Sequence, residues 1–242
     1  MSNQKCQFGG KFYDDATTVA EKPWYSVGGF SAFLPHDGGP TCDPTLTWWT
    51  QQHVDNLNAM IGKNCSVGNC LTSDHYKGIF YDIELIHDIT NLDFETSFKK
   101  AKAAGLKVMF STSYTFPIQD ENQAAGWPRS LVPTIQSILS SEHVDIVAPQ
   151  FYGDGFVPTG GAKGVCTGGV CDFAFWKRHL RADTQVMPIF KSFANGATGP
   201  PTQAGITADF NRQVDAIKAQ CSSDPDFKLF CRNNMFYLWN GN

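Results

Sequence analysis

The segment 78–84 (Gly-Ile-Phe-Tyr-Asp-Ile-Glu) carries two carboxylic acids separated by one residue. Its apolar and aromatic residues predict a buried strand, in which Phe80, Asp82 and Glu84 share one face because side chains alternate. Two acids on one face of a buried strand are costly to desolvate. At the carboxyl end of a parallel strand, such a pair can hold a proton and transfer it to a bound substrate. The alternative is a solvated strand end in which Glu84 forms a salt bridge.

Small, polar or aromatic residues also stand at the ends of the other apolar runs. The segment 25–29 ends in two glycines, which let a backbone or a ligand approach closely. The run that ends at residue 152 places Gln150 and Tyr152 on one face. The residues expected to meet at this edge of the sheet are Gly28, Gly29, Asp82, Glu84, Tyr114, Gln150, Tyr152 and Trp239. Their grouping predicts a binding or catalytic site at the carboxyl ends of the strands.

Short runs rich in aromatic and β-branched residues predict about six strands to position this site. These runs are residues 24–30, 78–84, 107–113, 144–152, 185–190 and 235–239. Between them, apolar residues recur at helical spacing. One helix is expected to end at Gly105, and others to begin near Asp43, Asp172 and Thr207, which can act as N-caps. Trp49 is expected to pack in the core rather than against a sugar.

The alternation of strands and helices predicts an α/β protein with parallel strands and right-handed crossovers. A TIM-like barrel and a doubly wound sheet both satisfy this pattern. The sequence contains no GxGxxG or GxxxxGK[ST] motif, so nucleotide binding has no support. With no linker or repeat, it predicts a single domain over residues 1–242, of which residues 1–22 form an irregular N-terminal segment.

In their order and spacing, the strand-end motifs resemble those of glycoside hydrolase family 18, the chitinase family, and most closely its plant hevamine-like branch. Segment 26–29 (SVGG) is similar to the SxGG motif of the third barrel strand, and segment 78–84 to the DxxDxDxE motif of the fourth. Segment 150–152 (QFY) is similar to the motif of the sixth strand, and Trp239 to the tryptophan that closes the eighth. The resemblance covers about residues 23–242 and implies a TIM-barrel-like (β/α) fold.

The resemblance implies retaining, substrate-assisted hydrolysis of β-1,4-linked N-acetylglucosamine polymers, without a metal or a cofactor. Glu84 would act as the general acid and then activate water, while Asp82 would hold the acetamide N–H of the substrate. Tyr152 would donate its hydroxyl to the attacking carbonyl oxygen, with Gln150 assisting. Trp239 would form an apolar floor under the sugar. Tyr114, Gly28 and Gly29 would line the binding site.

Two features depart from the family pattern. Phe80 stands where the family has a further aspartate beside the position of Asp82. The residues before the first matching strand are too few for two complete βα units of about 30 residues each. We therefore expect a barrel that is incomplete or compressed at its first two βα units. Residues 1–22 would cover part of the open edge, and a second copy of the chain would close the rest. The alternative functions are a chitinase-like protein that binds carbohydrate without cleaving it, and a structural or storage protein.

The composition excludes several other classes. A formal net charge of −4 disfavours nucleic acid as a partner, and no apolar run is long enough to span a membrane. The chain has eight cysteines, an even number, in loop-like sequence without a CxxC spacing, which favours disulfides over zinc. The expected pairs are Cys65–Cys70, Cys166–Cys171, Cys221–Cys231 and Cys6–Cys42. We therefore expect a secreted protein, or one from another oxidising compartment, with no signal peptide in this chain.

Overall fold

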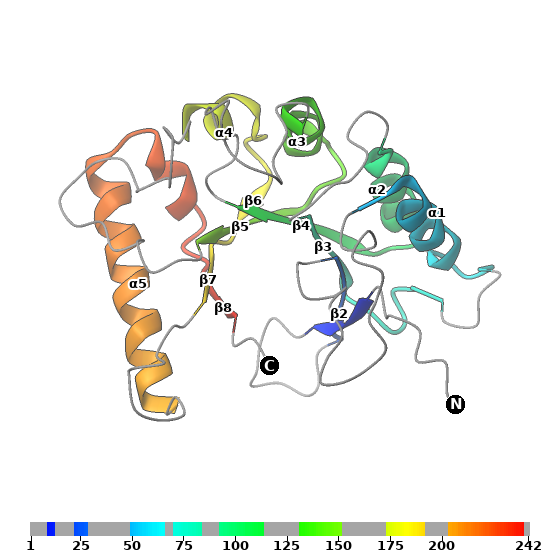
Figure 1. Cartoon of the computed structure of the whole chain (residues 1–242), viewed down its shortest axis with the longest axis horizontal. Coiled ribbons are helices and arrows are strands. Elements are labelled where there is room, and N and C mark those ends of the chain that lie inside the picture. The colour runs from blue at the N-terminus through cyan, green and yellow to red at the C-terminus, as the bar shows by residue number, and fades with distance from the viewer. Residues whose placement is uncertain are drawn as a thin grey trace. The chain divides into compact units, whose positions relative to one another are not determined.

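The computed structural model describes residues 9–12, 22–28, 49–65, 70–83, 92–113, 131–151, 173–191 and 203–239. Figure 1 labels the helices α1–α5 and the strands β2–β8 of these ranges. The chain divides into two compact units. Unit 1 comprises Met1–Ser111 and Ala124–Asp145, and unit 2 comprises Thr112–Gln123 and Ile146–Asn242. Each unit contains strands and helices of its own.

Four strands of unit 1 lie in the order β1-β2-β3-β4. They are β1 (Gly9–Phe12), β2 (Trp24–Gly28), β3 (Gly78–Asp82) and β4 (Lys107–Ser113), the last two residues of which belong to unit 2. β2, β3 and β4 are parallel, as the sequence predicts, whereas β1 runs antiparallel to β2. Residues 9–12 therefore form a strand along the edge of β2, within a segment for which the sequence predicted irregular structure.

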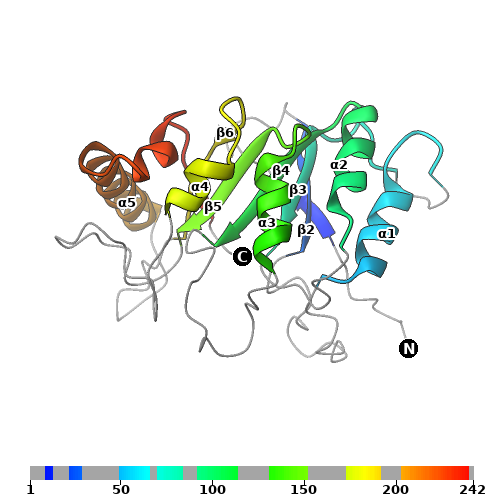
Figure 2. The ribbon, with the colours of Figure 1, turned by 90° about the horizontal axis from the view of Figure 1, so that it is seen from above.

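The helices α1 (Gln51–Met60) and α2 (Phe94–Ala103) of unit 1 lie side by side (Figures 1 and 2). α2 ends at the predicted place, since Gly105 follows it with a φ of 75°, a conformation that glycine adopts without strain. The predicted start of α1 at Asp43 is wrong. Its N-cap is Thr50, whose hydroxyl accepts a hydrogen bond from the His53 backbone N–H, while the His53 ring bonds the Thr50 backbone N–H.

Asp145, which follows α3 (Leu131–Ser140) in the chain, fixes the start of β4. Its Oδ2 accepts a hydrogen bond from the Val108 backbone N–H at 2.8 Å, and its own backbone N–H donates to the Val108 carbonyl oxygen at 3.0 Å. Its Oδ1 pairs with Lys102 of α2 at 2.6 Å. One side chain thus joins the end of α2, the amino end of β4 and the segment that leads out of unit 1.

In unit 2, β5 (Ile146–Phe151) lies parallel to two short strands, β6 (Gln185–Val186) and β7 (Ile189–Lys191), which follow each other along its edge. Gln150 aligns with Ile189, so the preceding residues, Pro149 and Pro188, stand opposite each other. Because proline has no N–H to donate, the ladder is interrupted where these prolines meet. β8 (Tyr237–Trp239) is parallel to β7 on its other side.

Three helical segments accompany the strands of unit 2. They are α4 (Phe173–His179), α5 (Gln203–Ser223) and the 3-10 helix η2 (Phe227–Cys231). Figure 1 shows the long α5 beside β7, which it contacts. The sequence placed the N-cap of this helix at Thr207, but the helix begins four residues earlier, at Gln203, so Thr207 lies inside it. Asp172, the predicted cap of α4, lies outside the described residues.

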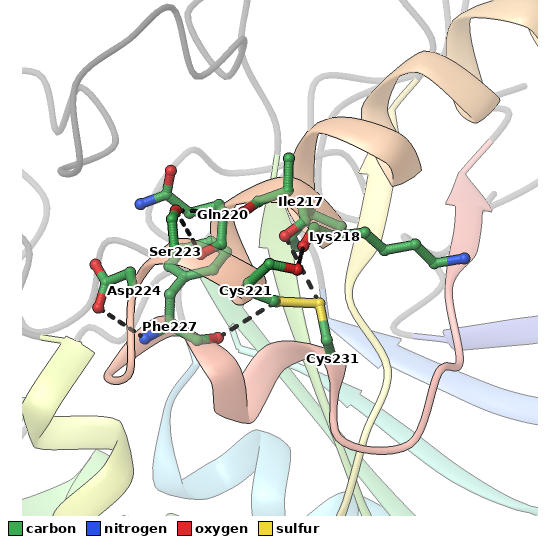
Figure 3. The surroundings of a disulfide bond; sticks show 10 residues. Ile217, Lys218, Gln220, Cys221, Ser223, Asp224, Phe227 and Cys231 are labelled. Carbon is green, nitrogen blue, oxygen red and sulfur yellow. Dashed lines mark hydrogen bonds between the residues drawn. A yellow bond between two sulfur atoms is a disulfide. The ribbon is translucent and has the colours of Figure 1, made fainter.

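Two of the predicted disulfides are present in the described ranges. Cys65–Cys70 closes the loop that follows α1, and Cys221–Cys231 joins α5 to η2. Figure 3 shows the second bond, in which Cys221 Sγ lies 3.6 Å from the carbonyl oxygen of Phe227. Phe227 is fully buried, so this disulfide lies against the aromatic core of unit 2. The other predicted pairs, Cys6–Cys42 and Cys166–Cys171, lie outside the described residues.

The described parts therefore form a mixed α/β protein whose strands are parallel except at β1. None of its described helices combines the length and the apolar character that crossing a membrane requires. The two disulfides are consistent with an oxidising compartment.

Candidate functional site at the carboxyl ends of the strands

Tyr81 identifies the two faces of β3. Its hydroxyl lies 2.8 Å from Ser97 Oγ, and its ring packs edge-on against Phe98 with centroids 4.9 Å apart. Both partners belong to α2, and all three side chains are fully buried. Tyr81 therefore faces α2, and the alternation of a strand places Phe80 and Asp82 on the opposite face. This is the arrangement that the sequence predicted for these residues.

The register across the three parallel strands of unit 1 groups the residues on this opposite face into rows. Asp82 aligns with Gly28 of β2 and with Ser111 of β4, at the carboxyl ends of their strands. In-register residues of parallel strands point to the same face. We call Gly28, Asp82 and Ser111 the upper row. It brings together two residues that the sequence assigned to the site, Gly28 and Asp82, and one that it did not.

The row below is mainly apolar. Phe80 aligns with Ser26 of β2 and Met109 of β4. Phe80 is 1% exposed and Met109 is fully buried. The half-buried Asp82 side chain thus projects from a strand whose preceding residue on the same face is an aromatic ring. No carboxylate stands at position 80 to share a proton with Asp82.

Gly28 is required by its backbone and by its neighbours. Its φ is 93°, a conformation that residues with a Cβ rarely adopt. A Cβ at this position would overlap the carbonyl oxygen of Asp82 and would lie 2.6 Å from Nε1 of Trp49. The Trp49 indole N–H donates to that same carbonyl oxygen at 3.1 Å. The close approach predicted for the glycines of this segment therefore occurs at Gly28 and is made by a tryptophan side chain.

Trp49 is 1% exposed and stacks near Tyr81 and edge-on against Phe94. It belongs to the core, as predicted, and it also orients the backbone at Asp82. The sequence offers no local signal for this contact, because Trp49 and Asp82 are 33 residues apart.

The end of β4 carries two buried hydroxyl groups. Ser111 and Thr112 are fully buried, and neither hydroxyl oxygen has a hydrogen-bond partner among the residues that the structure describes. A buried polar group without a partner is unusual in a folded protein. Because the two residues are adjacent in a strand, they point to opposite faces, and Ser111 points to the face of Asp82. The sequence signal for this feature is the change from apolar to hydroxyl residues at the end of the 107–113 run.

In unit 2, Gln150 is the polar residue of the corresponding strand end. It is 5% exposed and lies in the penultimate position of β5. The next residue, Phe151, packs against Phe190 of β7 and against Phe227 and Phe230 of η2. Alternation therefore places Gln150 on the face of β5 away from η2. Gln150 is thus a buried amide that aligns with the apolar Ile189 of β7.

Trp239 is the last residue of β8 and aligns with Lys191 of β7. In register, Ile189 aligns with both Gln150 and Tyr237. Positions 150, 189 and 237 therefore share one face of the unit 2 strands. Four other predicted site residues, namely Gly29, Glu84, Tyr114 and Tyr152, lie outside the described residues.

Burial shifts the pKa values of two described tyrosines. Complete burial raises the pKa of the Tyr81 hydroxyl far above its usual value, and the hydrogen bond with Ser97 opposes this only in part. Burial also raises the pKa of Tyr25, with a smaller contribution from Tyr76. Both tyrosines are therefore neutral hydrogen-bonding groups at neutral pH. Within the described ranges, no three histidine, cysteine, aspartate or glutamate side chains come together in a way that would hold a metal ion.

The comparisons with known proteins add no relative. No family model matches the chain, and no curated protein or solved structure matches it.

Proposed function

We propose that the protein is a retaining glycosidase that hydrolyses β-1,4-linked N-acetylglucosamine polymers by a substrate-assisted mechanism. The proposal rests on the resemblance of four strand-end motifs to glycoside hydrolase family 18. The observation that carries it best is the position of Asp82. This carboxylate lies at the carboxyl end of a parallel strand, on the face away from α2, beside a glycine that approaches its backbone. The same proposal includes a TIM-like barrel that is incomplete at its first two βα units.

In the proposed mechanism, the acetamide carbonyl oxygen of the substrate attacks the anomeric carbon of its own sugar. The bond to the leaving oxygen breaks as Glu84 donates a proton to it, and an oxazolinium ion forms. Asp82 accepts a hydrogen bond from the acetamide N–H and stabilises the positive charge. Tyr152 donates its hydroxyl to the attacking oxygen. Water, activated by Glu84, then opens the ion with overall retention of configuration.

The other residues of the proposed site bind the sugar. Gln150 would assist Tyr152, and its position on the face of β5 away from η2 supports this assignment. Trp239 would supply the apolar floor beneath the ring, with Tyr114 forming a wall of the groove. Gly28 and Gly29 would allow the sugar to approach the backbone. No cofactor and no metal take part in this proposal.

Phe80 favours a second candidate function, a chitinase-like protein that binds the polymer without cleaving it. A carboxylate at this position would exchange a proton with Asp82, whereas the buried ring of Phe80 cannot. A hydrogen bond from the acetamide N–H to Asp82 needs no such proton exchange, so binding would survive even where turnover is slow. This second function uses the same site as the hydrolase and differs from it only in lacking the chemical step.

One assay separates the two candidates. The protein is incubated with chitotetraose at about pH 3 to 8, a range that covers the titration of a catalytic carboxyl pair, and both cleavage and binding are followed. Cleavage with retained anomeric configuration supports the hydrolase. Calorimetric binding without cleavage supports the carbohydrate-binding protein. Neither binding nor cleavage contradicts both proposals and leaves a structural or storage role.

We also propose that the protein is secreted and that its sheet edge is covered in two ways. β1 already pairs with the edge of β2 through residues 9–12. A second copy of the chain would close the remaining edge, because exposed strand edges are rarely left open in globular proteins. Light scattering at micromolar concentration should therefore give the mass of a dimer, and a monomeric mass would contradict this part of the proposal.

A further inference from the structure

The unpartnered hydroxyl of Ser111 lies in the upper row with Asp82. Ser111 is fully buried, and its Oγ makes no hydrogen bond within the part of the chain that the structure describes. Leaving a buried hydroxyl without a partner is unfavourable, so a partner is expected in the working protein. The question is which group on this face can supply it.

The register leaves one polar side chain beside Ser111 among the described residues. Asp82 is its in-register neighbour on β3, and adjacent strands are about 4.8 Å apart. An aspartate carboxylate and a serine hydroxyl extending from neighbouring positions can therefore meet after rotation about χ1. The row below offers no alternative, since Phe80 and Met109 are apolar and buried, and Ser26 stands on β2, which β3 separates from β4. The other charged side chain on this face of the described β2, β3 and β4 is Lys107, at the opposite end of β4.

We propose that Ser111 is a positioning residue for Asp82, and that its hydroxyl donates a hydrogen bond to the Asp82 carboxylate. This contact would hold the carboxylate on the face where substrate is proposed to bind. The role in catalysis rests on the proposed function, but the contact itself does not require that the protein cleave or bind any sugar.

The chain offers a matched control on the same strand. Thr112 is the next residue, is equally buried, and also has a hydroxyl without a described partner, but it points to the other face of β4. Ser111→Ala and Thr112→Val each remove one such hydroxyl with little change in volume. Neither variant breaks a hydrogen bond that the structure describes. Thr112→Val should therefore unfold at the same denaturant concentration as the wild-type protein or a higher one, whereas Ser111→Ala also loses the proposed hydrogen bond to Asp82 and should unfold at a slightly lower one.

The test follows the titration of Asp82 directly. The whole protein is labelled with ¹³C at the aspartate carboxyl groups, the Asp82 signal is assigned from its loss in Asp82→Asn, and its chemical shift is recorded against pH. A hydrogen bond donated to the carboxylate favours the charged form and lowers the pKa of Asp82. Ser111→Ala should therefore raise this pKa by about one unit, a tenfold change in the protonation equilibrium, while Thr112→Val should leave it unchanged.

Equal Asp82 titrations in the wild-type protein and Ser111→Ala would overturn the proposal. Should Ser111→Ala fail to fold, Ser111→Cys gives the same test, because it keeps the volume and replaces the hydroxyl by a weak donor. The readout needs no substrate, so an inactive protein with a shifted Asp82 titration would contradict the proposed function and leave this inference standing. An active protein in which Ser111→Ala leaves the Asp82 titration unchanged would support the proposed function and overturn this inference.

Discussion

The buried pair of Tyr81 and Ser97 provides a quantitative test of how β3 is oriented. The two hydroxyl oxygens lie 2.8 Å apart, and both side chains are fully buried. Tyr81→Phe leaves the Ser97 hydroxyl without its partner, and Ser97→Ala leaves the Tyr81 hydroxyl without one. Each change should lower the free energy of unfolding by about 1–3 kcal/mol, the cost of an unsatisfied buried polar group.

The double variant should lose much less than the sum of the two single variants, because no unpaired hydroxyl remains. We expect a coupling free energy of about 1–2 kcal/mol between the two positions. Urea unfolding followed by fluorescence and circular dichroism measures all four proteins. Tyr25→Phe, the same substitution on the neighbouring strand, serves as a control. No described residue bonds its hydroxyl, so the loss should stay within about 0.5 kcal/mol.

Additive effects in this cycle would refute the reasoning. They would mean that Tyr81 does not meet α2 through its hydroxyl, and the assignment of Phe80 and Asp82 to the opposite face would then lose its support. The upper row and the candidate site depend on that assignment.

Three further predictions concern the same elements. Gly28→Ala should lower the free energy of unfolding in urea by about 2–4 kcal/mol, because it adds strain at a φ of 93° to an overlap with the carbonyl oxygen of Asp82; wild-type stability would contradict the close approach. Because burial raises the pKa of Tyr81, the neutral form stabilises the fold below about pH 10, and stability should fall above that pH by up to about 1.4 kcal/mol per unit. In alkaline urea titrations, Tyr81→Phe should lack this fall in stability. An identical decline in the wild-type protein and the variant would contradict the assignment of the fall to Tyr81. Removing the Cys221–Cys231 disulfide by a double alanine substitution should lower thermal stability by about 2–3 kcal/mol, and an unchanged melting temperature would show that the bond does not constrain the chain.

The strands of unit 1 could be predicted from local signals. The runs at 78–84 and 107–113 are rich in aromatic and aliphatic residues, and the observed strands begin at Gly78 and Lys107 as predicted. The face of Asp82 followed from alternation alone. The end of α2 followed from Gly105, whose positive φ few other residues tolerate.

The starts of two helices could not be read in the same way. Asp43, Thr50 and Thr207 are all residue types that favour N-cap positions, and the sequence does not show which of them is used. At α1, the cap is completed by His53 at the third helical position rather than by the usual glutamate or glutamine. At α5, the helix extends past Thr207 toward its amino end, so a good cap residue lies within it.

Contacts between distant segments were also beyond prediction. β1 has the sequence Gly-Gly-Lys-Phe, which has little strand propensity, and it is a strand because it pairs with β2. The indole of Trp49 and the hydroxyl of Ser111 reach the end of β3 only through the fold. The helix at 131–140 was not predicted either, whereas the disulfides at 65–70 and 221–231 followed from their short spacing.

The proposed function assigns to Glu84 the role of proton donor in a glycosidase. The most direct measurement is the initial rate of chitotetraose cleavage by Glu84→Gln, which keeps the size of the side chain and removes its proton. The matched control is Glu142→Gln, the same change at an exposed position in the turn after α3. The proposal predicts a loss of about 10²- to 10⁴-fold in Glu84→Gln and a wild-type rate in the control. Equal rates in the wild-type protein and Glu84→Gln would contradict it.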